Sequence, residues 1–218
     1  MHLLKVTKSN KTITLLIFCV LEATDGGKKT EVFIRPGNTT ITRNNKIGVL
    51  KNFGINFLMS FKLSISMLDT DIEWANILHF TIGDDSTNYG DRIPGIWLSS
   101  GARFFVSSAI NGYKDYNKHM DLDVAENEWY DFEISQLSTD DGKVIITKYV
   151  IYFSYPFIFQ HVFSCKIDDT VYWTIKNENP MNFEDVIMYI GDPWYPAAQS
   201  LVQGLTVKTI DCGESCFY

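Results

Sequence analysis

The sequence predicts an all-β fold in which two antiparallel sheets pack as a sandwich, and three observations lead to it. Apolar and polar residues alternate with a period of two along most of the chain, which is the pattern of half-buried strands. The 218 residues include 15 Phe, 11 Tyr and 5 Trp, and aromatic side chains favour strands. Turn signals separate short segments, and no long amphipathic helix pattern occurs. Many short strands, each with one apolar face, are expected to form two packed sheets.

The clearest expected strand covers residues 57–67, where every odd position is apolar and the even positions from 60 to 66 are Ser or Lys. The dipeptide Asn111-Gly112 is the strongest turn signal and predicts a tight hairpin. Further strands are expected at residues 77–82, 93–99, 102–108, 129–136, 143–153, 171–176, 186–190 and 201–210. Together these strands predict one domain, which we place at residues 24–211.

Residues 1–23 have the layout of a secretory signal peptide. Three lysines precede an apolar run at residues 13–21, and the small residue Ala23 suits a signal-peptidase site. The run is too short to span a bilayer comfortably, and we expect no transmembrane segment. The sequence therefore predicts a secreted, extracellular product, with a buried N-terminal strand or helix as the alternative interpretation.

In a secreted protein, cysteines are expected to form disulfides and an asparagine in the right triplet can be glycosylated. Cys212 and Cys216 lie in a C-terminal tail, residues 212–218, and are expected to close a small disulfide ring. In the alternative pairing, one of them reaches Cys165, which otherwise is free or intermolecular. Asn38, in the triplet Asn-Thr-Thr after a predicted turn at residues 35–37, is a candidate glycosylation acceptor.

The charge balance narrows the class of partner. With 19 Lys and Arg against 26 Asp and Glu, the chain carries a formal charge of −7. A nucleic-acid partner is not expected, because binding to phosphates favours a basic surface.

Five sequence segments carry a resemblance to a known family. They are WANILHF at residues 74–80, RIPGIWL at 92–98, NEWYDFEI at 127–134, NENP at 177–180 and GDPWY at 191–195. Over residues 50–210 the chain resembles the concanavalin A-like lectin/glucanase superfamily, and more narrowly the laminin G-like jelly-roll domains of secreted animal proteins. The resemblance implies a jelly-roll sandwich with one concave sheet, and loops at one rim that hold calcium and contact sugars, proteins or other matrix components.

Residues 150–164 depart from the pattern of that family. The segment is a nearly continuous aromatic and apolar run, interrupted by Pro156, and it has no polar face. One interpretation is a fully buried strand that Pro156 breaks into two pieces. The other is an insertion, such as translated intron, with residues 148–149 joining directly to residue 166; Cys165 would then be spurious too.

The best catalytic candidate is the acidic stretch Asp121-Leu-Asp-Val-Ala-Glu126. Glucanases of the resembled superfamily carry Glu-x-Asp-x-x-Glu on a strand, where two carboxylates flank the scissile bond. Here the first carboxylate belongs to Asp, whose side chain is one methylene shorter, and such a misplacement costs a large rate factor. We therefore expect a protein that is not an enzyme, with a β-glucanase-like glycoside hydrolase as the alternative.

The loop at residues 83–91 is the candidate metal site. It gathers several hard oxygen ligands, which calcium prefers: Asp84, Asp85, Asn88 and Asp91. The candidate ligand-binding residues are aromatic side chains near turns and a neighbouring amide: Tyr89, Asn111, Tyr113 and Tyr116. Trp194 and Tyr195 also lie beside a turn, where packing of the loop against the sandwich is the expected role of Trp194.

These features together predict a function. We expect a secreted recognition module that binds carbohydrate or an extracellular glycoprotein, with calcium as a cofactor that stiffens the loop at residues 83–91. A glycoside hydrolase of the same fold and a structural extracellular-matrix protein are the alternatives.

Overall fold

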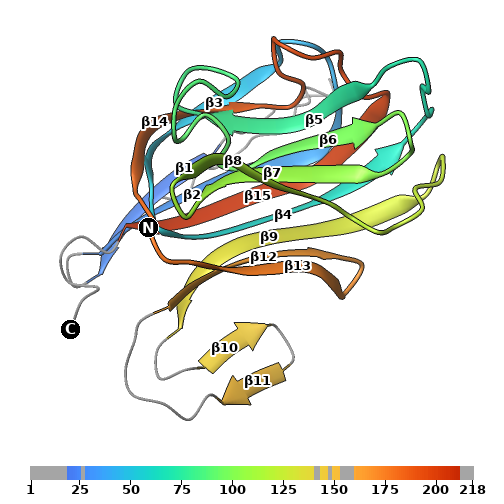
Figure 1. The fold of residues 1–218 in the computed structure, drawn as a ribbon. Coiled ribbons are helices and arrows are strands. Elements are labelled where there is room, and N and C mark those ends of the chain that lie inside the picture. Colours follow the sequence, from blue (N-terminus) through green and yellow to red (C-terminus); the bar gives the residue numbers. More distant parts are fainter. Residues whose placement is uncertain (1–18, 26–27, 140–142, 147–148, 153–159, 212–218) are drawn as a thin grey trace, which may run out of the picture.

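The computed structural model describes residues 19–25, 28–139, 143–146, 149–152 and 160–211. Every regular element in these residues is a β-strand, and the large sheets are antiparallel and pack face to face (Figure 1). The predicted all-β, two-sheet jelly-roll sandwich is confirmed. Among the same residues, no helix is long and apolar enough to cross a membrane.

One layer of the sandwich is a seven-stranded sheet. Its order is β1 (Cys19–Asp25), β2 (Lys28–Thr40), β15 (Ser200–Asp211), β4 (Asn56–Ile65), β9 (Trp129–Thr139), β12 (Gln160–Ile167) and β13 (Thr170–Asn177). Strands far apart in the sequence are neighbours here, because β15 pairs with both β2 and β4.

The other layer is a six-stranded sheet. Its order is β3 (Lys46–Phe53), β14 (Phe183–Tyr189), β5 (Trp74–Thr81), β6 (Gly95–Ser99), β7 (Phe104–Ile110) and β8 (Tyr113–His119). Strands β5 to β8 follow one another as a meander. The predicted hairpin turn at Asn111-Gly112 joins β7 to β8, with φ angles of 54° and 81°. Two consecutive positive φ angles are the geometry that an Asn-Gly pair favours.

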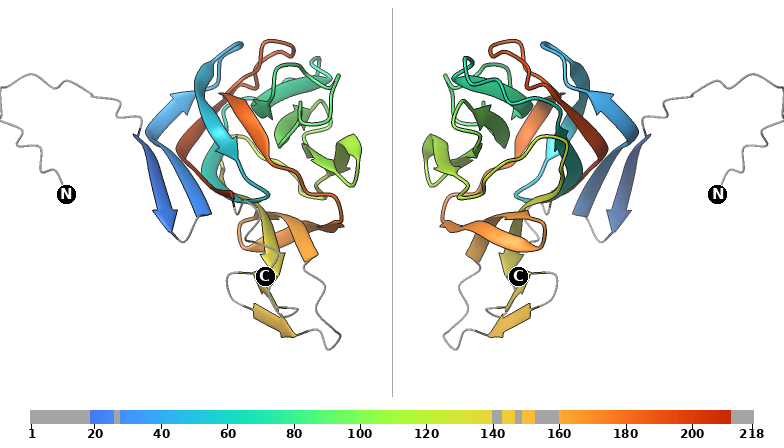
Figure 2. Two further views of the ribbon diagram at one scale, coloured as in Figure 1. Left: turned by 90° about the vertical axis from the view of Figure 1, so that its left-hand side faces the viewer. Right: turned by 90° about the vertical axis from the view of Figure 1, so that its right-hand side faces the viewer.

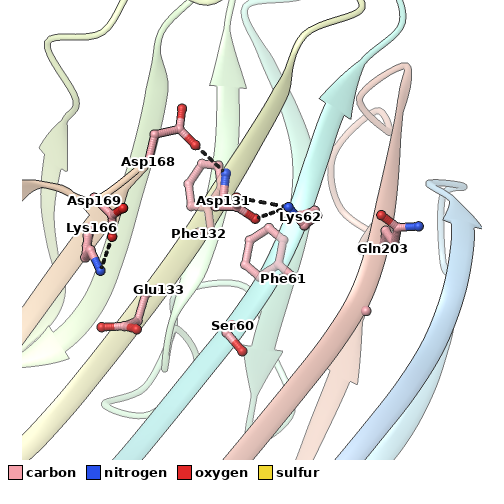
Figure 3. Close-up of a pocket in the computed structure, with 11 residues that line it drawn as sticks. Ser60, Phe61, Lys62, Asp131, Phe132, Glu133, Lys166, Asp168, Asp169 and Gln203 are labelled. Carbon is pink, nitrogen blue, oxygen red and sulfur yellow. Dashed lines mark hydrogen bonds and ion pairs between the residues drawn. The ribbon is translucent and has the colours of Figure 1, made fainter. Parts of the chain in front are cut away.

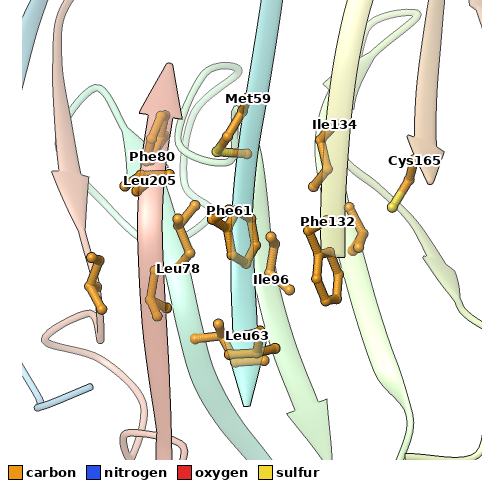
Figure 4. Packing of buried hydrophobic residues seen from close by; sticks show 14 of the residues in the cluster. Met59, Phe61, Leu63, Leu78, Phe80, Ile96, Phe132, Ile134, Cys165 and Leu205 are labelled. Atoms are coloured by element: carbon orange, nitrogen blue, oxygen red, sulfur yellow. The ribbon is translucent and has the colours of Figure 1, made fainter. Parts of the chain in front are cut away.

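The core lies between the two sheets, as Figure 4 shows. The alternation at residues 57–67 places Phe57, Met59, Phe61, Leu63 and Ile65 of β4 in it, each at most 5% exposed. The expected strand is therefore correct through Ile65. It is wrong at Met67, which lies beyond the end of β4 and is 44% exposed.

Strand β12 corrects the interpretation of residues 150–164 as an insertion. Gln160–Ile167 pairs with β9 on one side and β13 on the other, so it is an internal strand of the larger sheet. Phe163, Cys165 and Ile167 face the core and are at most 1% exposed. Joining residue 149 directly to residue 166 would delete most of this strand, and Cys165 is a core residue rather than a spurious one.

The single strand expected at residues 143–153 is also wrong. Lys143–Ile146 and Tyr149–Tyr152 instead form the short antiparallel strands β10 and β11, a separate two-stranded sheet. Figure 2 shows this hairpin projecting away from the sandwich. Pro156 and its neighbours at residues 153–159 lie outside the described residues.

The N-terminal part of the chain forms an antiparallel hairpin at the edge of the larger sheet. Residues 19–25 pair with residues 28–34 as β1 and β2, and residues 1–18 lie outside the described part. Cleavage after Ala23 would remove most of β1 and leave β2 as the edge strand.

The candidate glycosylation acceptor Asn38 is exposed and lies within β2, opposite Gln203 of β15. The turn predicted at residues 35–37 is instead an irregularity in the pairing of β2 with β15, because Arg35 pairs with Leu205 across a register shift. Cys212 and Cys216 lie outside the described residues.

Candidate functional site

The outer face of the six-stranded sheet is built by the residues that alternate with its core residues. Ile96 and Val106 pair across β6 and β7 and belong to the core. Because successive side chains point to opposite faces of a strand, Trp97 and its partner Phe105 lie on the outer side. His119 is the next cross-strand neighbour of Phe105, on β8.

Aromatic rings cover this outer side in a continuous series. We call the surface the aromatic face; it consists of Trp74, His79, Trp97, Phe105, His119, Tyr189, Trp194 and Tyr195. Neighbouring ring centroids are 4.9 to 6.0 Å apart, as between Trp74 and Phe105 (4.9 Å) or Trp97 and Phe105 (6.0 Å). Trp97 and His79 are buried at its base, whereas the other rings are half-buried or exposed.

A glycine allows the indole of Trp97 to lie along the sheet. Gly95 is two residues before Trp97 on the same side of β6, and a Cβ atom at Gly95 would stand 2.2 Å from Cη2 of the indole. Only a residue without a side chain fits under the ring. The GIW sequence of β6 therefore sets the ring flat at the centre of the aromatic face.

A buried histidine–aspartate pair fixes the loop that carries Trp194 and Tyr195. Nδ1 of His79 lies 2.8 Å from Oδ2 of Asp192, and both side chains are fully buried. Oδ1 of Asp192 accepts the backbone N–H groups of Trp194 and Tyr195 at 3.0 and 2.8 Å. Nε2 of His79 donates to the carbonyl oxygen of Asp91 at 2.6 Å, since a carbonyl can only accept.

Arg92 lies beside the centre of the aromatic face, and its positive charge is paired with the carboxylate of Asp85. Nη2 of Arg92 donates to both carboxylate oxygens of Asp85, at 2.9 and 3.0 Å, and Nε donates to the Asp85 carbonyl at 3.2 Å. The Arg92 guanidinium carbon is 4.6 Å from the centroid of Trp97, which is cation–π distance.

The hydroxyl of Tyr195 is 3.2 Å from both the Arg92 guanidinium and the Asp85 carboxylate. Burial first, and then the charge of Asp85, raise the pKa of Tyr195, so the ring keeps its proton. The side chains of Asp85, Arg92 and Tyr195 thus form one fixed polar group among the aromatic rings.

The loop at residues 83–91 uses its acidic groups within the protein. Asp91 is buried, and its carboxylate accepts the backbone N–H groups of Asp84 and Asn88. The hydroxyl of Thr87 and then the N–H of Asp85 hold the pKa of the Asp84 carboxyl below its usual range. Among the described residues, no group of three or more His, Cys, Asp or Glu side chains is arranged to hold a metal ion. Calcium binding here stays a prediction from the sequence.

The four predicted ligand-binding residues come together at one end of the sandwich. Tyr113 and Tyr116 are on β8 with their rings 5.9 Å apart, and Tyr113 is 64% exposed. Asn111 donates to the Lys176 carbonyl at 2.8 Å. Tyr89 donates to the Asn179 carbonyl at 3.3 Å. We call these four residues, Tyr89, Asn111, Tyr113 and Tyr116, the rim group. Asn111 is held by a hydrogen bond to the end of β13 and Tyr89 by one to the segment that follows β13, and Tyr113 offers the most exposed ring.

The glucanase-like motif does not lie on a strand. Asp121, Asp123 and Glu126 are exposed in the segment between β8 and β9. The Glu126 carboxylate accepts the backbone N–H of Leu68 at 2.7 Å. The hydrolase alternative assumed that these carboxylates lie on one strand. They lie in a segment between strands instead.

The outer face of the larger sheet carries an open groove of about 510 Å³. Figure 3 shows its charged lining across β4, β9 and β12. Lys62 pairs with Asp131 at 2.8 Å, and Lys166 pairs with Asp169 at 3.0 Å. The lining of this groove has no exposed aromatic ring among the described residues. We therefore place the candidate site on the aromatic face.

No protein-family model and no curated protein matches the chain. Solved structures with a similar fold include a heptameric SAP-like pentraxin from Limulus polyphemus, at 10% identity and a TM-score of 0.46, covering 81% of this chain and 75% of that one. A galectin from Caenorhabditis elegans has 9% identity and a TM-score of 0.41, with 78% and 94% covered.

The binding domain of botulinum neurotoxin serotype D has 12% identity and a TM-score of 0.44, with 83% of this chain covered. The chain spans 38% of the length of that toxin chain. These likenesses describe the arrangement of strands alone.

Sequence reasoning missed most of the aromatic face. It assigned Trp194 to packing, and the structure places that ring 5.2 Å from His79, so the packing is real while the ring stays half-buried. The sequence carried a signal at Trp97 and Phe105. In each strand the alternating pattern leaves an outward-facing position where a polar residue is expected, and that position holds a large aromatic ring instead.

Proposed function

We propose that the chain is a secreted, non-catalytic recognition module that binds carbohydrate, free or on an extracellular glycoprotein, through the aromatic face. A sugar ring offers an apolar surface of C–H groups bordered by hydroxyls. Ligand sites suited to such molecules combine aromatic side chains with a few fixed polar groups. The observation that carries the proposal is the placement of Arg92, Asp85 and Tyr195 directly beside the ring of Trp97.

The location of the site is tested with aromatic substitutions on two surfaces. An array of immobilised oligosaccharides identifies bound glycans, and calorimetry then compares Trp74→Ala and Trp194→Ala with Tyr113→Ala of the rim group. We expect each of the first two variants to lose about 1 kcal/mol, roughly fivefold in affinity, since each removes stacking area. Tyr113→Ala should bind like the unsubstituted protein. Loss of binding in Tyr113→Ala alone would move the site to the rim group, and absence of binding to every glycan would refute the proposed function.

Repeating the titrations with a chelator and with calcium tests the proposed cofactor. Calcium bound by residues 83–91 would raise the melting temperature, and Asp84→Ala should remove that rise. If calcium produces neither heat nor a shift in melting temperature, the loop is held by its own hydrogen bonds alone.

The proposed compartment is tested by the mass of the protein recovered from the culture medium. We expect a mature N-terminus at Thr24 and a glycan on Asn38, because the signal-like segment ends at Ala23 and the Asn38 side chain is exposed. Asn38→Gln is the control for the glycan mass. Retention of the chain inside the cell with Met1 in place would contradict secretion.

A further inference from the structure

The charged groups at the aromatic face are compensated within the protein. The cation nearest its centre, Arg92, is held by the carboxylate of Asp85 through two contacts of 2.9 and 3.0 Å. The imidazole of His79 lies against the carboxylate of Asp192 at the base of the face. A ligand at this surface therefore meets oriented donors and acceptors rather than a net positive charge.

The ion pair with Asp85 leaves one nitrogen of Arg92, Nη1, available to donate a hydrogen bond to a ligand. Its Nε and Nη2 groups are occupied by Asp85 and Tyr195, and Nη1 has no hydrogen-bond partner among the described residues. The side chain of Arg92 is 11% exposed and that of Asp85 is 22% exposed. Because the guanidinium is held against the ring of Trp97, Nη1 is fixed in direction and can donate to an uncharged acceptor such as a sugar hydroxyl.

We infer that Asp85 makes the aromatic face select neutral saccharides over acidic ones. This inference rests on the proposed function and names the ligand class of the same site. A carboxylate or sulfate that accepted from Nη1 would lie close to the negative charge of Asp85, which already compensates the charge of Arg92. A neutral sugar accepts from Nη1 without displacing Asp85. Asp85 is thus a specificity-determining residue, and Arg92 is the group whose charge it masks.

The test is the substitution Asp85→Asn, which keeps the size of the side chain and one carbonyl acceptor for Arg92 while removing the charge. The protein and the variant are compared on an array of neutral, uronic-acid and sulfated oligosaccharides in chelator-containing buffer. We expect the unsubstituted protein to prefer neutral glycans. The variant should gain about tenfold for acidic ones, which is the effect of one charge-assisted hydrogen bond. That gain should shrink as salt is added.

Two further variants separate this effect from net charge and from folding. Asp84→Asn changes the net charge by the same amount in the same loop, but the Asp84 carboxylate contacts Thr87 and the N–H of Asp85 rather than Arg92; it should gain nothing for acidic glycans. The double variant Asp85→Asn with Arg92→Gln should lose the gain. Thermal unfolding of each variant must stay cooperative.

Each outcome is decisive. Neutral binding with no acidic gain in Asp85→Asn would overturn this inference and leave the proposed function standing, as would an equal gain in Asp84→Asn. Preference of the unsubstituted protein for acidic glycans would also overturn it. Binding to no glycan by any of the proteins would refute the proposed function and this inference together.

Discussion

Replacing Asp192 with alanine is expected to lower the free energy of unfolding by about 3–5 kcal/mol, because it leaves the buried His79 without its partner. Both side chains are fully buried, 2.8 Å apart. The substitution also removes the acceptor for the N–H groups of Trp194 and Tyr195. Urea unfolding followed by tryptophan fluorescence measures the loss directly.

Two comparisons make this result specific to the buried pair. Asp192→Asn keeps an oxygen for the two N–H groups, and its amide can donate to Nδ1 of a neutral His79, so it should cost clearly less than alanine. Glu178→Ala removes a carboxylate paired with Lys176 at the surface, where Glu178 is 64% exposed, and should cost less than about 1 kcal/mol. A cost for Asp192→Ala no larger than that of Glu178→Ala would contradict the importance of the pair.

The same substitution connects stability with function. The N–H groups of residues 194 and 195 fix the start of the loop after β14, and that loop brings two rings onto the aromatic face. The folded fraction of Asp192→Ala, which lacks the acceptor for these N–H groups, should therefore bind glycans less tightly than the unsubstituted protein. The fold and the proposed site are joined at this residue.

Strand β4 shows what a single sequence can predict. Its alternating pattern specifies both its secondary structure and which side chains face the core, because period-two burial follows from strand geometry. Met67 continues the alternation although it lies beyond the end of β4, because an alternating pattern does not show where a strand ends. The Asn111-Gly112 turn was predictable for the same local reason, as the dipeptide favours two positive φ angles.

Trp97 and Phe105 each gave a local signal, but the aromatic face as a whole was not predictable, because its assembly depends on the register between strands. Trp97 and Phe105 are neighbours only because of the register in which β6 and β7 pair. Trp194 belongs to a loop nearly a hundred residues after Trp97 in the sequence. The pairing of Asp85 with Arg92 was hidden for a similar reason, since the loop between them folds back on itself.

Strand β12 was obscured by its surroundings. Within it Phe163, Cys165 and Ile167 alternate with Ser164 and Lys166, which is an ordinary half-buried pattern. The preceding aromatic run concealed this alternation, so the whole segment was interpreted as one feature. The described parts of this segment, residues 150–152 and 160–164, belong to the hairpin strand β11 and the internal strand β12.

Replacing Phe163 with alanine is therefore expected to destabilise the protein by about 3–5 kcal/mol, the cost of a cavity at a buried phenylalanine. The side chain is fully buried, with its ring 4.9 Å from Trp173 and 6.4 Å from Phe57. Denaturant unfolding of the purified variant measures the loss. Ser164→Ala is the matched control, because Ser164 alternates to the outer side and should change stability by less than about 0.5 kcal/mol.

Deletion of residues 150–164 extends the same argument to the whole strand. It would remove the residues of β12 that pair with residues 135–139 of β9 and with residues 174–177 of β13. The edge strand β13 would lose most of its hydrogen-bonded neighbour, and Trp173 would lose the ring of Phe163. We expect a chain that no longer unfolds cooperatively and is recovered in low yield. A deletion variant that keeps a sharp unfolding transition at the original midpoint would show instead that these residues are dispensable, as an insertion would be.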